Sequence, residues 1–239
     1  MSIYKYKLIT IYYSWRENNN LITTDFSIQS FKGGFDNNFS YLVTCMRSGI
    51  EIIIDASLKL DRLKPFFKSN PAMILITHTH TDHIQYISSY LECFPDIKII
   101  GHPDSKNNFD NNRFIPISDN STIEVGNMKI KTIYTPGHYF DSICYWIENV
   151  IFTGDTVFVG RTGRTIGNRS DINELYDSVY KKILKLPRDT YIYPGHDYGI
   201  KPSITIEENI KISKLLKAES RSDFFDRMTN YEKNRKIGS

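Results

Sequence analysis

Residues 77–83 of this chain, Thr-His-Thr-His-Thr-Asp-His, gather three histidines and one aspartate within seven positions. The whole chain contains only six histidines, so half of them fall in this short stretch. Neutral imidazole and carboxylate groups are suitable ligands for zinc, iron or manganese. A single His-x-His pair often consists of ordinary surface residues. Four ligand-type residues directly after an apolar segment, by contrast, predict a metal site.

The spacing within this motif indicates which side chains can act together. Side chains alternate along a strand with a period of two, so His78, His80 and Asp82 are expected to point the same way. They follow the apolar segment 72–76, which is typical of a buried strand. His83 is expected in the turn into the next helix, from which it can approach from another side. The motif thus predicts one pocket that several ligands share.

Three further segments show the same pattern of an apolar strand, a glycine turn and a ligand-type residue. Thr-Pro-Gly-His ends at His138, Thr-Gly-Asp ends at Asp155, and Tyr-Pro-Gly-His ends at His196. Each pattern alone is weak, because glycine turns after strands are common. Together with the first motif they place five of the six histidines at the ends of strands. The remaining histidine, His102, is expected to be structural or exposed.

The elements that must hold these residues are many strands with interposed helices. Strands are expected at 3–13, 25–32, 39–45, 50–55, 72–76, 98–101, 128–134, 142–147, 150–153 and 190–193. Helices are expected at 57–69, 84–94, 172–186, 204–217 and 222–236. This mixture favours packed sheets covered by helices. We expect one domain over residues 1–200, with an extra N-terminal strand within residues 1–24, and a helical extension over 201–239 that packs on it.

Composition is that of a globular protein and argues against several functional classes. Hydrophobic residues make up 40% and charged residues 24% of the 239 residues, which is ordinary for such proteins. The formal net charge of +3 comes without a long run of lysines or arginines, so nucleic acid is not an expected partner. The sequence also contains no apolar run of the ~18 residues that span a bilayer, so no membrane association is expected.

The three cysteines, Cys45, Cys93 and Cys144, are widely spaced and form no Cys-x-x-Cys pair. This pattern argues against a disulfide framework and against a thiolate zinc site. The first residues also lack the apolar segment and the small-residue cleavage site of a secretory signal. We therefore expect a reducing, cytoplasmic setting.

The assembled order His-x-His-x-Asp-His, then His, Asp and His, resembles the metallo-β-lactamase superfamily in residue type, order and spacing. The resemblance covers roughly residues 25–200. It implies an α+β fold, an αββα sandwich of two mixed sheets flanked by helices, with the metal site at one edge of the sheets. It also implies ligands for a first metal ion, namely His78, His80 and His138, and for a second, namely Asp82, His83 and His196. Asp155 would bridge the two ions, and Asp82 and Asp155 are the carboxylates expected to take part in catalysis.

The resemblance implies two zinc ions, or iron or manganese in their place. Such a dinuclear centre activates water by lowering its pKa and stabilises the oxyanion that forms at the attacked carbonyl. A hydrolase of this kind needs no serine or cysteine nucleophile, which agrees with the weak sequence context of the three cysteines.

The segment around residues 154–198 resembles the branch that contains glyoxalase II, which is hydroxyacylglutathione hydrolase, and the persulfide dioxygenases. Both place a basic residue nine positions after the bridging aspartate, here Arg164, and a tyrosine two positions after the last histidine, here Tyr198. The resemblance implies that these two residues help to hold glutathione, since the guanidinium fork of arginine suits a carboxylate. Arg161 is a further candidate for binding substrate.

The sequence also departs from both relatives at particular positions. Tyr139 follows His138 where a small hydroxyl residue is common, and Ile166 stands where the dioxygenases have an aspartate. Only 39 residues follow Ile200, whereas glyoxalase II carries a longer helical C-terminal domain with further glutathione contacts.

The function expected first is a dinuclear metallo-hydrolase that acts on a thioester such as an S-acylglutathione. The alternative is a persulfide dioxygenase that acts on glutathione persulfide, for which the resemblance implies a single Fe(II) on His78, His138 and Asp155. A lactonase, an RNA nuclease and a metal-binding protein without catalysis rank lower. The expected partner is a small thiol or thioester, and the sequence leaves a homodimer open.

Overall fold

The apolar segments 39–45 and 50–55 form two adjacent strands, β5 (Asn38–Cys45) and β6 (Glu51–Ile54), in the middle of a seven-stranded sheet. Every residue of both strands is buried, because the sheet is covered on both faces. The side chains alternate between the two faces: Tyr41 and Val43 pack toward a second sheet, and Leu42 packs toward helices. The computed structural model describes residues 10–11, 14–17, 20–23, 26–109 and 112–234.

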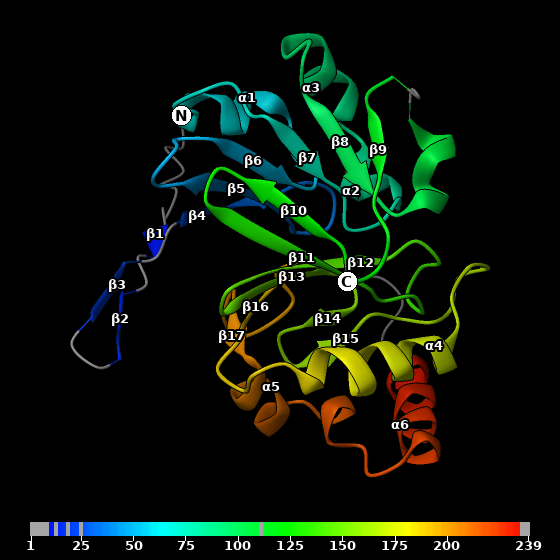
Figure 1. The fold of residues 1–239 in the computed structure, drawn as a ribbon. Coiled ribbons are helices and arrows are strands. Elements are labelled where there is room, and N and C mark those ends of the chain that lie inside the picture. Colours follow the sequence, from blue (N-terminus) through cyan, green and yellow to red (C-terminus); the bar gives the residue numbers. More distant parts are fainter. Residues whose placement is uncertain (1–9, 12–13, 18–19, 24–25, 110–111, 235–239) are drawn as a thin grey trace, which may run out of the picture.

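Two mixed sheets face each other in the middle of the molecule (Figure 1). The first has the order β1 (Thr10–Ile11), β4 (Phe26–Gly33), β5, β6, β7 (Met73–Leu75), β8 (Lys98–Gly101) and β9 (Phe114–Pro116). The second has the order β10 (Thr122–Val125), β11 (Met128–Tyr134), β12 (Ile143–Ile147), β13 (Val150–Gly154), β16 (Tyr191–Pro194) and β17 (Ile204–Thr205). Two small hairpins complete the strands: β2 (Ser14–Glu17) with β3 (Asn20–Thr23), and β14 (Val157–Phe158) with β15 (Arg161–Thr162).

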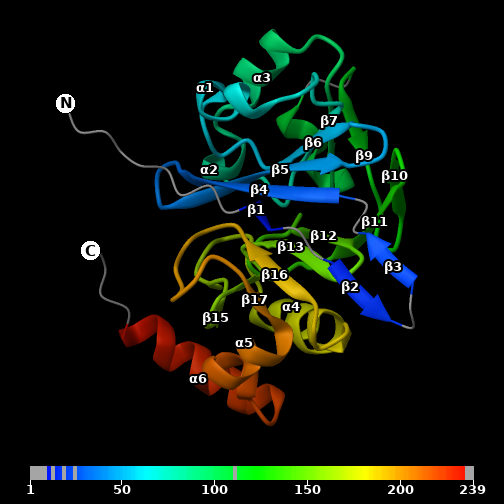
Figure 2. The same ribbon diagram turned by 90° about the vertical axis from the view of Figure 1, so that its left-hand side faces the viewer.

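Helices cover both outer faces of this pair of sheets, as Figure 2 shows from the side. The first sheet carries α1 (Leu60–Leu63), α2 (Thr81–Ile84) and α3 (Ile87–Cys93), with Leu63 and Tyr90 buried against it. The second sheet carries α4 (Ile172–Asp177), α5 (Ile206–Ile212) and α6 (Arg221–Asn234), with Leu175 and Phe224 buried in one apolar cluster. The expected α+β sandwich of helices, two sheets and helices is therefore confirmed.

Several helices are shorter than the sequence pattern predicts. The helix expected at 57–69 ends at Leu63 and continues only as a 3₁₀ turn over Lys64–Phe66, because Pro65 has no N–H to donate. The helix expected at 172–186 is α-helical only to Asp177. It continues as a π-helix over Ser178–Lys182 and ends in a 3₁₀ turn over Ile183–Lys185. The helix expected at 204–217 breaks after Ile212, and Leu215–Lys217 forms a separate 3₁₀ turn.

Around the first motif, the helix expected at 84–94 begins earlier, as α2, and is interrupted before α3. Asp82 and His83 therefore lie in a helical turn. The side-chain alternation expected for a strand can apply only to the loop before this turn, which contains His78 and His80. The strand expected at 3–13 lies largely outside the described residues. Its described part, β1, pairs with β4 at the edge of the first sheet.

The strands that matter for function end at the same side of the sandwich. β13 and β16 are parallel neighbours, so Asp155 and His196, which follow them, meet at one edge. β6 and β7 are likewise parallel and bring Asp55 next to the loop that begins at Thr77. The two sheets are joined at this edge by the N–H of Phe39, which donates to the carbonyl of Gly195 at 2.7 Å. Within the part of the chain that the structure describes, no helix is both long and apolar enough to cross a membrane.

Candidate metal centre

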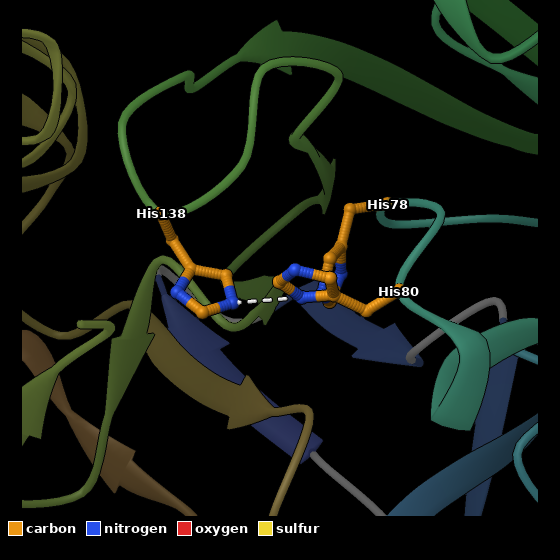
Figure 3. A group of neighbouring side chains, drawn as sticks. All are labelled: His78, His80 and His138. Atoms are coloured by element: carbon orange, nitrogen blue, oxygen red, sulfur yellow. Dashed lines mark hydrogen bonds between the residues drawn. The ribbon is translucent and has the colours of Figure 1, made fainter. Parts of the chain in front are cut away.

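The ligands expected from the sequence lie together at this edge of the two sheets. Their ligand atoms form three groups, each within 4.8 Å: His78, His80 and His138; His78, His83 and Asp155; and Asp82, His83 and His196. Figure 3 shows the first group, with two histidines from the loop after β7 facing His138 from the loop after β11. The remaining histidine, His102, lies outside these groups and stacks on Tyr134 with ring centroids 4.1 Å apart, which agrees with the expected structural role.

The first group consists of three imidazoles with ring nitrogens turned toward one another. Nδ1 of His80 lies 2.9 Å from Nε2 of His78 and 3.1 Å from Nε2 of His138. A neutral imidazole has one donor and one acceptor nitrogen. If Nδ1 of His80 carries a proton, that one proton faces two ring nitrogens, those of His78 and His138. If Nδ1 carries no proton, it is a single acceptor facing both of these nitrogens. Three such nitrogens in contact therefore favour a shared cation between them.

Asp155 lies between this first group and the group of Asp82, His83 and His196, which we call the second group. Its Oδ1 is 3.2 Å from Nε2 of His83, and its Oδ2 is 3.4 Å from Nε2 of both His138 and His196. Oδ1 is buried and has no hydrogen-bond partner, so the contact with His83 is an ion-pair contact without hydrogen-bond alignment. One carboxylate thus reaches ligand atoms of both groups.

Asp82 reaches the second group through His196. Its Oδ2 lies 3.3 Å from Nε2 of His196 and accepts a hydrogen bond from Nδ2 of Asn38 at 2.9 Å. Nε2 of His196 in turn lies 3.3 Å from Nε2 of His83. The side chain of Asp82 is 28% exposed, whereas that of Asp155 is 10% exposed, so Asp82 is the carboxylate nearer to solvent.

The ring nitrogens that face away from the centre are fixed by acceptors elsewhere in the protein. Nδ1 of His138 donates to the carbonyl of Arg164 at 3.0 Å, and Nδ1 of His196 donates to the carbonyl of Asp36 at 2.8 Å. A carbonyl can only accept, so the proton of a neutral ring lies on Nδ1 and the lone pair of Nε2 faces the centre. Such contacts orient metal-ligating histidines and set their tautomer.

Asp55 fixes the ring of His83 in the same way, and the sequence did not single this residue out. Its Oδ2 lies 2.8 Å from Nδ1 of His83. The N–H and the hydroxyl of Thr77 donate to the same carboxylate at 2.8 and 2.7 Å. The sequence signal was present, since Asp55 ends an apolar strand just as Asp155 does, but it lacks the glycine turn used to recognise the others.

Electrostatics separate the two groups. Burial lowers the pKa of His78 well below its ordinary value and, with the neighbouring His138, lowers that of His80 to about 4. Burial also lowers the pKa of His83 and His196, but the Asp155 carboxylate outweighs it. The pKa of His83 is raised well above its ordinary value, and that of His196 to about 9. The first group is therefore neutral, whereas a cation at the second group would have to displace protons from His83 and His196.

Glycine permits the close approach of these residues at Gly195. A Cβ atom there would lie 2.4 Å from Oδ1 of Asp155 and 2.7 Å from Cε1 of His83. The backbone of the Pro-Gly-His turn therefore packs directly against two of the ligands, which no other residue type would allow.

The set of side chains fits bound metal ions. Ligand atoms about 2.0–2.1 Å from a tetrahedral zinc ion lie about 3.3–3.4 Å from one another. The contacts of Asp155 with His83, His138 and His196 have this spacing, at 3.2, 3.4 and 3.4 Å. The buried Oδ1 of Asp155 makes no hydrogen bond, so its lone pairs are available to a bound cation.

The residues expected to bind substrate lie beside the centre in different situations. The ring of Tyr198 stacks on His196 with centroids 4.8 Å apart, and its hydroxyl donates to the carboxylate of Asp36. Arg161 donates to the carbonyl of Tyr198 at 2.5 Å and to the hydroxyl of Tyr231 at 3.2 Å. The guanidinium of Arg161 thus donates to two groups of the protein itself. Its contact with substrate, like that of Tyr198, stays a prediction.

Arg164 is exposed. Burial lowers the pKa of His138, and the positive charge of Arg164 adds a smaller effect in the same direction. The substrate contact of Arg164 stays a prediction as well. The next residue, Thr165, is held by the C-terminal helix: its N–H donates to Oε1 of Glu232 at 2.9 Å. The loop that carries Arg164 is therefore held on one side by the metal centre and on the other by α6.

Comparison with known proteins agrees with this fold. The family model of the metallo-beta-lactamase superfamily matches residues 33–196, and the chain belongs to this superfamily. The resemblance stated from the motifs is thereby confirmed, and membership of this superfamily implies metal binding.

The chain is similar to particular members of the superfamily. It is 37% identical over 169 residues to a hydroxyacylglutathione hydrolase of Francisella philomiragia. The aligned segment covers 67% of this chain and 63% of that protein. It is 32% identical over 197 residues to a probable hydroxyacylglutathione hydrolase of Schizosaccharomyces pombe, with 77% and 74% covered. The crystal structure of ETHE1 from Myxococcus xanthus matches with a TM-score of 0.76 and 25% identity, over 87% of this chain and 92% of that one. The chain thus spans just under two thirds of the length of the Francisella relative.

Proposed function

We propose that this protein is a metal-dependent hydrolase that cleaves a thioester such as an S-acylglutathione at a dinuclear centre. The observation that carries the proposal is the position of Asp155, whose two carboxylate oxygens reach His83 on one side and His138 and His196 on the other. A carboxylate so placed is suited to bridge two ions. The names of the Francisella and Schizosaccharomyces relatives, hydroxyacylglutathione hydrolase, support the thioester as substrate class.

In this proposal the two sites take separate ligands. His78, His80 and His138 would hold the first ion, and Asp82, His83 and His196 would hold the second. Two zinc ions, or iron or manganese in their place, would supply a water of lowered pKa and would polarise the thioester carbonyl. Asp155 joins the two sites, which is why we propose that it acts in catalysis as well as in metal binding.

The protein's own groups orient the reactants. Asp82 is held by Asn38 and remains partly exposed, so its carboxylate can accept a hydrogen bond from the attacking water. The Asp55 carboxylate and the carbonyls of Asp36 and Arg164 keep the imidazole rings turned into the centre. The thiolate that leaves needs no strong acid, because a thiol has a pKa near 8.5 in its free form.

The second candidate is a persulfide dioxygenase with one Fe(II) held by His78, His138 and Asp155. Nε2 of His138 lies 3.4 Å from Oδ2 of Asp155, and His78 shares a 4.8 Å group with each of these two residues. Two histidines and one carboxylate with open positions suit non-haem iron. The hydrolase is preferred because Asp82, His83 and His196 are also assembled as a ligand set.

Two assays on the purified protein separate the candidates. The hydrolase proposal predicts cleavage of S-lactoylglutathione, followed as the loss of thioester absorbance, with no uptake of oxygen. The dioxygenase alternative predicts oxygen uptake with glutathione persulfide and no cleavage of the thioester. The second result would overturn the proposal.

The finer expectations on organisation are proposals as well. We propose that residues 201–239 extend the main domain, since Phe224 and Met228 of α6 share an apolar cluster with Leu175 of α4. The cytoplasmic setting agrees with three free cysteines. It stays a prediction, as do the absence of a nucleic-acid partner and the homodimer that the sequence leaves open.

A further inference from the structure

A cavity of about 700 Å³ lies beside the metal centre and is lined by residues that the sequence did not single out for function. It is open to solvent and lies between the 3₁₀ helix Pro103–Asn108 and the loop before α4. Two cations contribute to its wall, Lys106 and Arg169, together with Asn107, Asn108 and the ring of Phe140.

One aromatic wall separates this cavity from the candidate ligands. The ring of Tyr139 lies 4.0 Å from the ring of His80 and 4.8 Å from that of Phe140, measured between centroids. The guanidinium of Arg169 lies 4.6 Å from the centroid of the Phe140 ring. Two aromatic side chains, Tyr139 and Phe140, therefore lie in sequence between His80 and the guanidinium of Arg169.

The cavity and the metal centre are held in a fixed relation by Asp141. This buried carboxylate accepts hydrogen bonds from the hydroxyl of Thr79 at 2.6 Å and from the hydroxyl of Ser105 at 2.8 Å. Thr79 lies between two of the ligands, and Ser105 lies in the 3₁₀ helix that lines the cavity. The hydroxyl of Tyr134 also donates to the carbonyl of Phe140 at 2.7 Å. The distance between the centre and the cavity is therefore set by the fold.

The charges around the cavity favour an anion. Lys106 and Arg169 are exposed, and neither has a carboxylate partner among the described residues. The carboxylate of Asp104, also in the wall, is 62% exposed and lies 3.6 Å from Nδ1 of His102. Among the described residues of the wall, two cations stand against one carboxylate, which favours an anion, and the guanidinium fork of Arg169 is suited to bind a carboxylate through two hydrogen bonds.

We propose that this cavity is a subsite that binds a carboxylate on the thiol portion of the substrate, with Arg169 and Lys106 as its specificity-determining residues. The inference rests on the proposed thioester hydrolysis and names the class of its substrate, a thioester of an anionic thiol. It agrees with the contacts of Arg161 and Tyr198, whose polar groups donate to Tyr231 and Asp36 of the protein itself.

The test compares two thioesters in the full-length protein and in a Lys106→Ala/Arg169→Ala variant. S-lactoylglutathione carries carboxylates, whereas the lactoyl thioester of N-acetylcysteamine carries none. The KM for the anionic thioester is expected to rise about tenfold, which corresponds to about 1.4 kcal/mol, with kcat nearly unchanged. The KM for the neutral thioester is expected to stay the same. Equal changes for both thioesters, or no change for either, would overturn the subsite.

A matched control removes one lysine and one arginine elsewhere. Lys185 and Arg188 are exposed and do not line the cavity, so Lys185→Ala/Arg188→Ala is expected to leave both KM values unchanged. Arg169→Lys keeps the charge but loses the guanidinium fork, and we expect it to restore part of the affinity lost in Arg169→Ala. All the substituted residues are exposed, so the variants are expected to unfold at the temperature of the unmodified protein.

Direct binding distinguishes failure of the subsite from failure of the proposed function. Glutathione itself, titrated into the protein by calorimetry, is expected to bind with a Kd about tenfold higher in the Lys106→Ala/Arg169→Ala variant. This measurement needs no turnover, so it tests the subsite even if no thioester is cleaved. A Kd unaffected by the two substitutions would overturn the subsite even in an active hydrolase.

Discussion

Glu232, near the end of α6, accepts a hydrogen bond from the backbone N–H of Thr165 at 2.9 Å and from its hydroxyl at 3.3 Å. The residue before Thr165 is Arg164, whose carbonyl accepts the hydrogen bond from Nδ1 of His138. The C-terminal helix thus braces the segment that orients one of the candidate ligands. Tyr231, the neighbour of Glu232, contacts Arg161 at the other end of this segment.

We therefore predict that Glu232→Ala weakens metal binding, although Glu232 is not among the candidate ligands. Direct outer contacts of ligands change metal affinity by about 10–100-fold, and Glu232 acts one contact further out, so an increase in Kd of several-fold is expected. Competition with a chromophoric chelator measures it. Glu232→Gln keeps an oxygen acceptor and is expected to have a smaller effect. Unchanged metal affinity in Glu232→Ala would show that the brace has no role in the centre.

Asp55 is predicted to matter more, because it contacts a ligand directly. Asp55→Asn removes the negative charge that faces Nδ1 of His83, and metal affinity is expected to fall about 10–100-fold. Asp119→Asn is the matched control, since Asp119 pairs with Lys182 and accepts the N–H of Tyr134 away from the centre. If both variants bind metal equally well, Asp55 does not support His83.

Gly195→Ala is predicted to abolish most activity and to lower the metal content. The added methyl group would lie 2.4 Å from Oδ1 of Asp155, so the carboxylate or the turn must move. Gly167→Ala serves as the control, because its nearest neighbour would be Oγ of Ser170 at 4.0 Å. Elemental analysis and thioester turnover check both variants. Full activity in Gly195→Ala would contradict the packing described for this turn.

Metal binding is predicted to release protons and to weaken as the pH falls. In the metal-free protein the Asp155 carboxylate, acting against burial, raises the pKa of His196 to about 9, so below this pH the ring holds a proton that a metal must displace. Calorimetric titration with zinc at pH 7.5, in two buffers of different ionisation enthalpy, measures the protons released. Metal affinity that does not change between pH 7 and pH 9 would be inconsistent with a protonated His196.

The candidate ligands could be located from the sequence because each group of them follows an apolar strand. Strands that run in the same direction end at the same edge of a sheet. The sequence did not locate Asn38, which contacts Asp82 across 44 residues, or Asp36, whose carbonyl meets His196 across 160 residues. Such contacts depend on how the two sheets meet, which no local pattern records. For the same reason, the sequence indicated Arg161 and Tyr198 as candidates for binding substrate but did not show that they contact Tyr231 and Asp36.

The order of layers was also predictable, because strand and helix patterns alternate in the way that a covered pair of sheets requires. The interruptions of the helices were harder to predict. The apolar spacing over 172–186 continues through the widened turn after Asp177, since the same face stays buried against the second sheet. The cavity with Lys106 and Arg169 was not predictable at all, because it joins segments that are some 60 residues apart in the chain.

In the proposed function, two metal ions joined through Asp155 would carry out hydrolysis of a thioester. The most direct test is the metal content per chain, measured by elemental analysis on the same sample that is assayed with S-lactoylglutathione. The proposal predicts two ions per chain in the active protein, and loss of both metal and turnover in Asp155→Ala. One iron ion per chain, with oxygen uptake in the presence of glutathione persulfide and no thioester cleavage, would contradict it.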